Sequence, residues 1–183
     1  MVRKALTGIG NDCRKNPTAN SAGQSVLELG VGTGNLSLLF AQKGCQIFGT
    51  DFSYRMLEHA RHKLPQATLL QADLRRTWPA ELNRQFDRIV SAYVFHHFEL
   101  ALKVAILKEL AQLLKPDGRM VIADLAFSDQ RAMLAVQLAV GSSWEEEFYW
   151  VADEALQELS QAGLPASFLP VSACVGIFII PWP

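Results

Sequence analysis

Three glycines spaced two residues apart separate an apolar segment from an amphipathic one near the start of this chain. The sequence VLELGVGTGNLSLLF covers residues 26–40 and carries Gly30, Gly32 and Gly34 at its centre. A short apolar run, a glycine turn and a segment of helical period are typical of a strand, a tight turn and a helix. Because glycine has no side chain, the backbone of this turn can pass close to a ligand and adopt unusual dihedral angles.

The remainder of the chain repeats the alternation of strand and helix. Apolar runs bounded by turn residues predict strands at residues 25–29, 45–51, 67–73, 86–94, 119–125, 166–173 and 174–180. Helical periods and stop signals predict helices at residues 35–43, 53–64, 99–114, 132–140 and 146–161. Residues 1–24 are expected to form a short irregular N-terminal segment and residues 25–183 a single domain. The pattern predicts an α/β fold whose mostly parallel sheet is covered on both faces.

Composition limits the classes of partner. The 17 Lys and Arg residues nearly balance the 18 Asp and Glu residues, so no global charge attracts nucleic acid or an anionic membrane. The three cysteines, Cys13, Cys45 and Cys174, lack metal-ligand spacing and suit a reducing compartment. The late apolar run at residues 174–181 is too short to span a bilayer. We therefore expect a soluble cytoplasmic protein with neither a nucleic-acid nor a membrane partner.

The glycine turn lies where a parallel α/β sheet binds its ligand, at the carboxyl end of a strand. A dinucleotide fingerprint requires Gly-x-Gly-x-x-Gly, but counting from Gly30 and Gly32 puts Asn35 in the third position. Asp51 closes the second predicted strand, where a partly exposed carboxylate can accept hydrogen bonds from both hydroxyls of a ribose. NAD-dependent enzymes also place an acid there, so Asp51 indicates an adenosine ligand without choosing between the two cofactor classes.

Three motifs carry a resemblance to a known family. The sequence ELGVGTG at residues 28–34 resembles the first motif of class I S-adenosylmethionine-dependent methyltransferases. Together with IVSAYVFHHF at residues 89–98 and ADLAFSDQ at residues 123–130, it is similar to the small bacterial YrrT-like methyltransferases, over about residues 25–180. The resemblance implies a Rossmann-like three-layer sandwich. Its seven-stranded, mostly parallel sheet would have the order 3-2-1-4-5-7-6 with strand 7 antiparallel.

The resemblance also implies S-adenosylmethionine as the cofactor and S-adenosylhomocysteine as its product. Glu28 would face the amino group of the methionine portion or its water shell, and Asp51 the ribose. Asp73 would accept a hydrogen bond from the adenine amino group, while the backbone of Ala72 meets a ring nitrogen. The full set implied for the donor is Glu28, Gly30, Gly32, Gly34, Asp51, Phe52, Ala72, Asp73 and Ser91.

The acceptor is expected to approach just beyond the fourth strand, where His96 and His97 follow one another. A histidine is a suitable general base for a thiol or hydroxyl acceptor at neutral pH, although such a pair can equally pack to fix a loop. Tyr93, Asp124 and Tyr149 are further candidates for substrate contact, and Asp124 can alternatively cap a turn. No cysteine or third histidine has the spacing of a metal ligand, so no metal site is predicted.

Three functions are compatible with these residues. The first is methyl transfer to a small-molecule acceptor by a monomer or homodimer. Members of the YrrT-like group usually carry an N-terminal segment with a Trp-Ala and Tyr-Asp signature, which does not occur before Ser25. An open site is therefore expected, and a catalytically idle S-adenosylmethionine-binding protein or partner subunit is the alternative. A nucleotide-dependent oxidoreductase is less compatible, because Asn35 replaces the third glycine.

Overall fold

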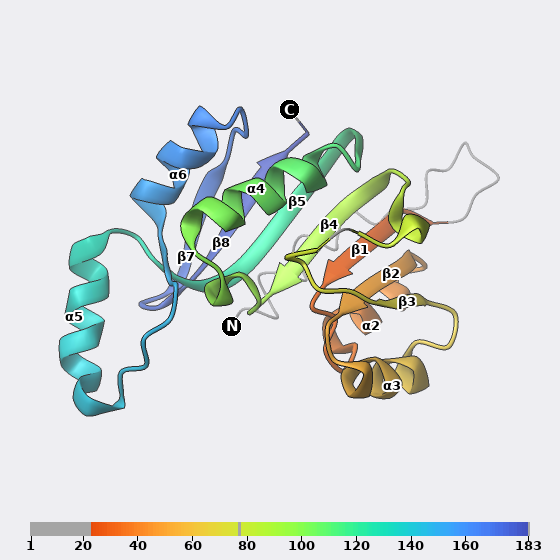
Figure 1. The fold of residues 1–183 in the computed structure, drawn as a ribbon, viewed down its shortest axis with the longest axis horizontal. Coiled ribbons are helices and arrows are strands. Elements are labelled where there is room, and N and C mark those ends of the chain that lie inside the picture. The colour runs from red at the N-terminus through yellow and green to blue at the C-terminus, as the bar shows by residue number, and fades with distance from the viewer. Residues whose placement is uncertain (1–22, 77, 183) are drawn as a thin grey trace.

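The computed structural model describes residues 23–76 and 78–182 (Figure 1). Its strands are β1 (Ser25–Leu29), β2 (Gln46–Asp51), β3 (Thr68–Gln71), β4 (Phe86–Ala92), β5 (Leu114–Phe127), β6 (Trp150–Val151), β7 (Ser167–Ser172) and β8 (Val175–Pro181). Its longer helices are α2 (Asn35–Ala41), α3 (Tyr54–Lys63), α4 (Leu100–Ala111), α5 (Gln130–Val140) and α6 (Ala152–Gln161). Single 3₁₀ turns form η2 (Ala80–Leu82), η3 (Phe95–His97) and η4 (Gly141–Ser143). The predicted irregular segment and Cys13 lie outside the described residues, apart from Gly23 and Gln24.

The sheet has the order β3-β2-β1-β4-β5-β8-β7, with the short β6 paired separately to β5. The first five strands are mutually parallel, whereas β8 runs antiparallel to both β5 and β7. With β7 and β8 as the predicted sixth and seventh strands, the expected order 3-2-1-4-5-7-6 and the antiparallel seventh strand are confirmed. The parallel strands bring their carboxyl ends to one edge of the sheet, where the glycine turn also lies.

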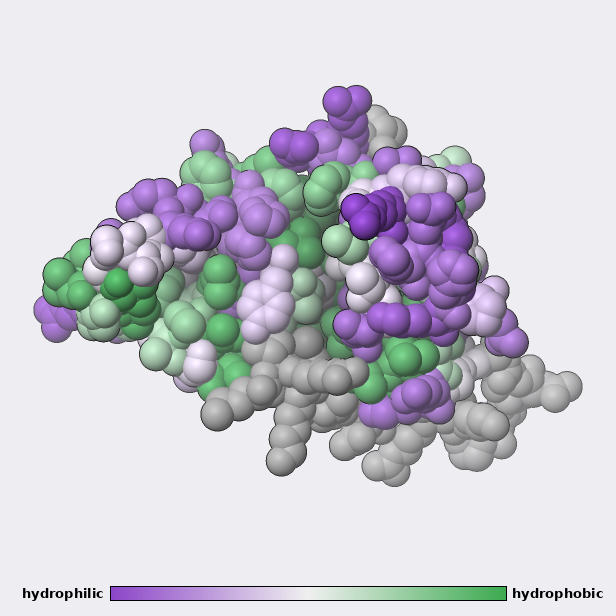
Figure 2. All heavy atoms as spheres, turned by 90° about the horizontal axis from the view of Figure 1, so that it is seen from below, coloured by the Kyte–Doolittle hydropathy of each residue, from purple (hydrophilic) through white to green (hydrophobic). Residues whose placement is uncertain are grey.

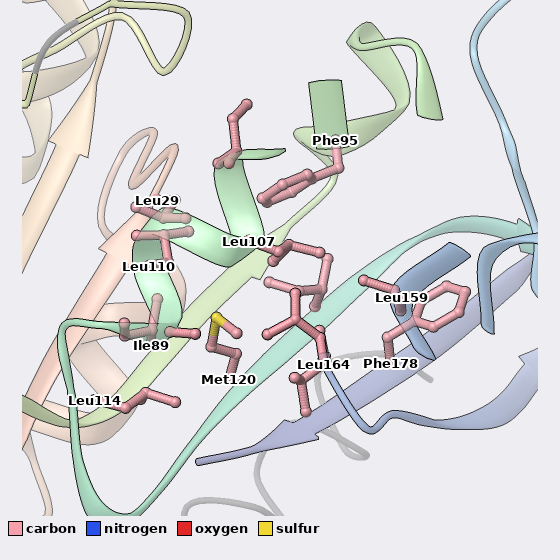
Figure 3. Packing of buried hydrophobic residues seen from close by; sticks show 14 of the residues in the cluster. Leu29, Ile89, Phe95, Leu107, Leu110, Leu114, Met120, Leu159, Leu164 and Phe178 are labelled. Atoms are coloured by element: carbon pink, nitrogen blue, oxygen red, sulfur yellow. The ribbon is translucent and has the colours of Figure 1, made fainter. Parts of the chain in front are cut away.

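One face of the sheet packs against α4 and α6 (Figure 3). Successive strand residues point to opposite faces, so alternate positions such as Leu27 and Leu29 of β1 share this side. The labelled members of the cluster are Leu29, Ile89, Phe95, Leu107, Leu110, Leu114, Met120, Leu159, Leu164 and Phe178. Removing this apolar area from water is the main stabilising contribution to the fold.

The opposite face is covered by α2 and α3. Phe40 of α2 packs in a cluster with Val26 and Ile47. Leu57 and Ala60 of α3 pack in a separate cluster with Val31 and Leu69. The hydroxyl of Ser53 accepts a hydrogen bond from the backbone N–H of Met56 at 3.4 Å and so caps the N-terminus of α3. The two covered faces confirm the three-layer sandwich.

The prediction of a helix at residues 146–161 is wrong for residues 146–151. Residues 144–149 are not helical, Trp150–Val151 pair in parallel with β5, and α6 begins only at Ala152. Glu145, Glu146 and Glu147 therefore do not form the first turn of a helix. Trp150 is fully buried, and the centroid of its ring lies 4.7 Å from the centroid of the Phe178 ring. This tertiary packing overrides the local helical preference of residues 146–151.

The helix α5 follows directly from β5 and projects from the body of the molecule (Figure 1). The side chain of Asp129 caps it by accepting from the N–H of Ala132 at 2.8 Å, and none of the residues of α5 is buried. Viewed from below, green apolar residues lie among pale and purple ones at the left end of the molecule (Figure 2). Leu134 and Leu138 of α5 are exposed apolar side chains. The α5 helix therefore adds little to the core.

No helix within residues 23–76 and 78–182 combines the length and the apolar character needed to cross a bilayer. Within the same part of the chain, Cys45 is buried and Cys174 is partly buried.

Candidate active site

The glycine turn after β1 adopts the left-handed backbone conformation that its sequence predicts. Gly30, Gly32 and Gly34 have φ values of 65°, 51° and 79°. A Cβ at Gly30 would lie 2.2 Å from Cγ2 of Val94, so this glycine is required for packing. A Cβ at Gly32 would meet no described atom within 4 Å, so the space beside Gly32 is open. The turn thus combines a fixed backbone with room for a ligand at its second glycine.

Asp51 holds this turn from the end of β2. Its Oδ2 accepts a hydrogen bond from the backbone N–H of Gly32 at 2.8 Å, and its Oδ1 accepts one from the N–H of Ser53 at 2.9 Å. Asp51 is only 7% exposed, so the expectation of a partly exposed carboxylate is wrong. The reason is that both oxygens are already used to join the glycine turn to the N-terminus of α3.

Glu28 lies one residue before the end of β1 and is buried, with 3% exposure. The hydroxyl of Ser37, in the first turn of α2, donates a hydrogen bond to Oε2 of Glu28. Burial raises the pKa of Glu28 to about 8, against the opposing effect of the Ser37 hydrogen bonds. The carboxyl group is therefore mainly protonated at neutral pH, and it ties β1 to α2 behind the glycine turn.

We expect Glu28→Gln to remove a pH-dependent loss of stability. In the unfolded chain the carboxyl ionises near pH 4.5, whereas in the folded protein it keeps its proton to about pH 8. The folded state binds more protons in this window, so the free energy of unfolding falls as pH rises from 4.5 to 8 and is constant beyond it. The fall is on the order of 5 kcal/mol, and the neutral amide does not share it.

Urea unfolding at pH 5 and pH 8 measures this difference, with Glu28→Gln compared with the exposed Glu58→Gln as a matched control. The gap between Glu28→Gln and the wild type should widen in favour of the variant at pH 8, while Glu58→Gln follows the wild type. Parallel stability profiles for all three proteins would contradict a buried, protonated Glu28.

The end of β3 presents a second carboxylate. Asp73 accepts hydrogen bonds from Nε and Nη2 of Arg75 at 2.9 and 3.0 Å, and Nε of Arg76 lies 3.7 Å from its Oδ2. These contacts, led by the Arg75 hydrogen bond, lower the pKa of Asp73 below its usual range. The N–H of Ala72 already donates to the carbonyl of Asp51 at 3.0 Å. The expectation that this N–H serves an adenine nitrogen is therefore wrong, because it extends the pairing between β2 and β3.

The two other residues implied for the donor differ in accessibility. Phe52 is highly exposed, and its carbonyl accepts a hydrogen bond from Nε2 of Gln71 at 2.8 Å. Ser91 in β4 is fully buried, and its hydroxyl donates to the carbonyl of Leu29 at 3.1 Å. The hydroxyl of Ser91 thus joins two strands of the sheet, whereas the ring of Phe52 faces solvent beside Asp51.

The two histidines that follow β4, His96 and His97 of η3, have different environments. His96 is buried, its Nδ1 lies 2.6 Å from Oδ1 of Asp124, and its backbone N–H donates to Oδ2 of the same carboxylate at 2.9 Å. Asp124 also accepts from the N–H of Leu125 at 2.8 Å and is 0% exposed. In neutral His96 the carboxylate holds the proton on Nδ1 and leaves Nε2 as the acceptor nitrogen. Asp124 therefore orients His96 and, being buried, is not available for direct contact with a substrate.

His97 and the candidate tyrosines lie at the surface of the same edge. The side chain of His97 is exposed, and its Nδ1 lies 3.6 Å from Oε2 of Glu147. Tyr93 has a φ of 58° and is 45% exposed. Burial, followed by the charges of Asp124 and Cys174, raises the pKa of Tyr93 and keeps its phenol neutral. Tyr149 donates its hydroxyl to the carbonyl of Glu145 at 2.5 Å.

Comparison with known proteins defines the family of the chain. Residues 26–118 match the model of a methyltransferase domain. An uncharacterized methyltransferase of Geobacillus kaustophilus is 36% identical over 178 residues, covering 92% of this chain and 81% of the relative. The chain belongs to the methyltransferase family. A second uncharacterized methyltransferase, from Geobacillus sp. (strain WCH70), is 36% identical over 76% of this chain and 63% of its own length.

Solved structures show the same fold at low sequence identity. The magnesium protoporphyrin IX methyltransferase of Synechocystis PCC 6803, crystallised with bound SAH, has a TM-score of 0.73 and 17% identity, covering 100% of this chain and 84% of its own. DesVI of Streptomyces venezuelae has a TM-score of 0.73 and 20% identity over 97% of this chain and 90% of its own. These likenesses, together with the family match, favour a methyltransferase over the oxidoreductase alternative.

Sequence reasoning missed Lys103, a buried lysine of this methyltransferase. Its Nζ donates a hydrogen bond to the carbonyl of Phe148 and lies 4.2 Å from the centre of the Trp150 ring. Burial lowers the pKa of Lys103 to about 8, and the nearby charge of Asp124 opposes this shift. Leu107 and Leu110 follow Lys103 at the spacing of one helix face, so helical periodicity was the available signal.

Two hollows of the methyltransferase lie away from the glycine turn. One, of about 570 Å³, is lined by residues from the start of β5 and β7 and the end of β8, at the opposite edge of the sheet. The other, of about 1010 Å³, lies between α4 and the connection from β3 to β4, beside Arg75 and Arg76. Neither contains the glycines, Asp51 or His96, so the candidate active site is defined by its side chains and backbone rather than by either hollow.

Proposed function

We propose that this protein transfers a methyl group from S-adenosylmethionine to a small-molecule acceptor whose reacting atom carries a proton. The observation that carries the proposal is the pair formed by His96 and Asp124 at the same sheet edge as the glycine turn. The family match supports methyl transfer, and the SAH bound in the Synechocystis structure supports the identity of the donor.

The residues around the glycine turn fit the donor. Gly32 leaves open space where a side chain would otherwise project, and each carboxylate oxygen of Asp51 has capacity for a further hydrogen bond beyond its backbone partner. These oxygens would hold the ribose hydroxyls. Asp73 would accept from the adenine amino group while it shares its charge with Arg75. Glu28 would act behind the turn by fixing β1 to α2.

The chemistry divides between the donor and the protein. When bound, S-adenosylmethionine supplies a methyl group already activated on a sulfonium. The protein has to align the acceptor with that group and exclude water, which lowers the entropic part of the barrier. Nε2 of His96 takes the proton that the acceptor loses, and Asp124 stabilises the resulting imidazolium. Tyr93 and Tyr149 would line the acceptor side.

The direct test is formation of S-adenosylhomocysteine from S-adenosylmethionine in the presence of thiols, phenols, amines and carboxylic acids of metabolite size. The proposal expects product with a chemically related subset of these acceptors. Binding of the donor without product across the whole collection would instead favour the catalytically idle S-adenosylmethionine-binding protein.

A further inference from the structure

The segment of residues 144–149, which we call the strap, crosses from η4 to β6 at the acceptor edge. The backbone N–H and the backbone carbonyl of one strap residue, Phe148, both form hydrogen bonds with residues outside the strap. The backbone N–H of Phe148 donates to the carbonyl of His96 at 3.0 Å, and the carbonyl of Phe148 accepts from Nζ of Lys103. The side chain of Phe148 is itself exposed, so the strap is anchored there through its backbone.

Two further hydrogen bonds lie within the strap itself, whereas Oε2 of Glu147 lies 3.6 Å from Nδ1 of the exposed His97 and the N–H of Trp144 donates to the carbonyl of Gly141. The hydroxyl of Tyr149 donates to the carbonyl of Glu145, and the N–H of Tyr149 donates to the carbonyl of Glu147 at 2.9 Å. The rings of Trp144 and Tyr149 pack on each other with centroids 4.8 Å apart. These contacts give the strap an internal shape, and the rings of Trp144 and Tyr149 also pack on Phe127 of β5, with centroids 6.1 and 5.6 Å apart. Phe148 adds the hydrogen bonds that reach η3 and α4.

Placing a lysine at position 103 costs free energy, because the position is buried. It is 1% exposed, and burying an ammonium group is unfavourable unless specific partners compensate. An apolar side chain could fill the same space beside Trp150 at lower cost. The partners that Lys103 gains are the Phe148 carbonyl, the face of the Trp150 ring and the charge of Asp124. The Phe148 carbonyl belongs to the strap, and Asp124 is the carboxylate that orients His96.

We propose that Lys103 is a positioning residue that holds the strap against His96, so that residues 144–149 form a fixed wall of the acceptor site. The role of the strap as an acceptor wall rests on the proposed methyl transfer, whereas its attachment by Lys103 does not. Without the ammonium group the Phe148 carbonyl loses its partner, and the bond from the Phe148 N–H to the His96 carbonyl becomes the remaining backbone link to η3. The strap then opens more often and the acceptor site loses its shape.

Amide hydrogen exchange tests this attachment without an acceptor. In Lys103→Met, exchange at the Phe148 amide should accelerate about tenfold or more, while β1 and β2 exchange as in the wild type. Lys108→Met removes an exposed lysine of the same helix and serves as the matched control, with no acceleration in the strap. Lys103→Arg keeps a charged donor and should restore strap exchange to within about threefold of the wild type.

The outcomes separate the attachment from the proposed function. Unchanged strap exchange in Lys103→Met overturns the inference, and acceleration in every peptide shows that Lys103 only supports global stability. If Lys103→Met does not fold, the test uses Lys103→Arg instead. Amide exchange in the strap that is more than about tenfold faster than in the wild type, with β1 and β2 unchanged, would show that a charged donor at this position does not hold the strap, and would contradict the inference. Titration of S-adenosylhomocysteine into the wild type and Lys108→Met reports separately on donor binding. Once an acceptor is known, the Lys103→Met substitution should raise the KM for that acceptor by a larger factor than it changes the affinity for S-adenosylhomocysteine.

Discussion

We expect His96→Gln to lower the rate of methyl transfer by about 10²- to 10⁴-fold, because it removes the general base proposed to accept the proton of the acceptor. Glutamine preserves the approximate size and a polar end, but it cannot take up a proton at neutral pH. Single-turnover formation of S-adenosylhomocysteine with an identified acceptor measures the loss. Affinity for S-adenosylhomocysteine should stay within a few fold, since His96 is not among the residues proposed to hold the donor.

Two further variants distinguish this role from general damage to the loop. Asp124→Asn should also slow transfer, because an amide does not hold the imidazole in the same tautomer or stabilise its charged form. His97→Gln should change the rate little, because the His97 ring is exposed and pairs with the partly exposed Glu147 rather than with Asp124. Equal losses in His96→Gln and His97→Gln would contradict the assignment of the base to His96.

Asp51→Ala is expected to reduce the affinity for S-adenosylhomocysteine by about 5- to 150-fold, which corresponds to roughly 1 to 3 kcal/mol. The variant loses the two acceptors proposed for the ribose hydroxyls. It also leaves the N–H groups of Gly32 and Ser53 without their carboxylate partner, so the glycine turn becomes less well fixed. Isothermal titration calorimetry measures the affinity, and thermal unfolding reports the accompanying loss of stability.

A surface carboxylate provides the control for this experiment. Glu58→Ala removes one negative charge from exposed α3 and should leave the affinity unchanged. A folded Asp51→Ala protein that binds S-adenosylhomocysteine as tightly as the wild type would show that Asp51 serves only to fix the glycine turn.

The order of the sheet could be predicted because its signals are local or depend on the resemblance to a family. The apolar strands, the glycines at their ends and the cap at Ser53 each occupy a few consecutive residues. The strap could not be predicted in the same way. Residues 146–161 have a helical pattern, but burial of Trp150 and its pairing with β5 begin the helix six residues later.

The candidate site was predictable to the level of residue type and position along the strands. Asp51 ends β2 as predicted, whereas Asp73 lies two residues beyond β3 and the histidine pair lies in η3, a few residues beyond β4. What separates His96 from His97 is contact with Asp124, which is 28 residues away in the chain. Lys103 likewise depends on a partner at Phe148, 45 residues distant. Such distant pairings leave no local pattern in a single sequence.

The most direct test of the central claim is calorimetric titration of S-adenosylhomocysteine and of NAD into the wild-type protein under the same conditions. The proposed donor site predicts saturable one-to-one binding of S-adenosylhomocysteine and an affinity for NAD that is weaker by about a hundredfold or more, roughly 2.7 kcal/mol. Absence of S-adenosylhomocysteine binding, or NAD binding of equal or greater affinity, would contradict it.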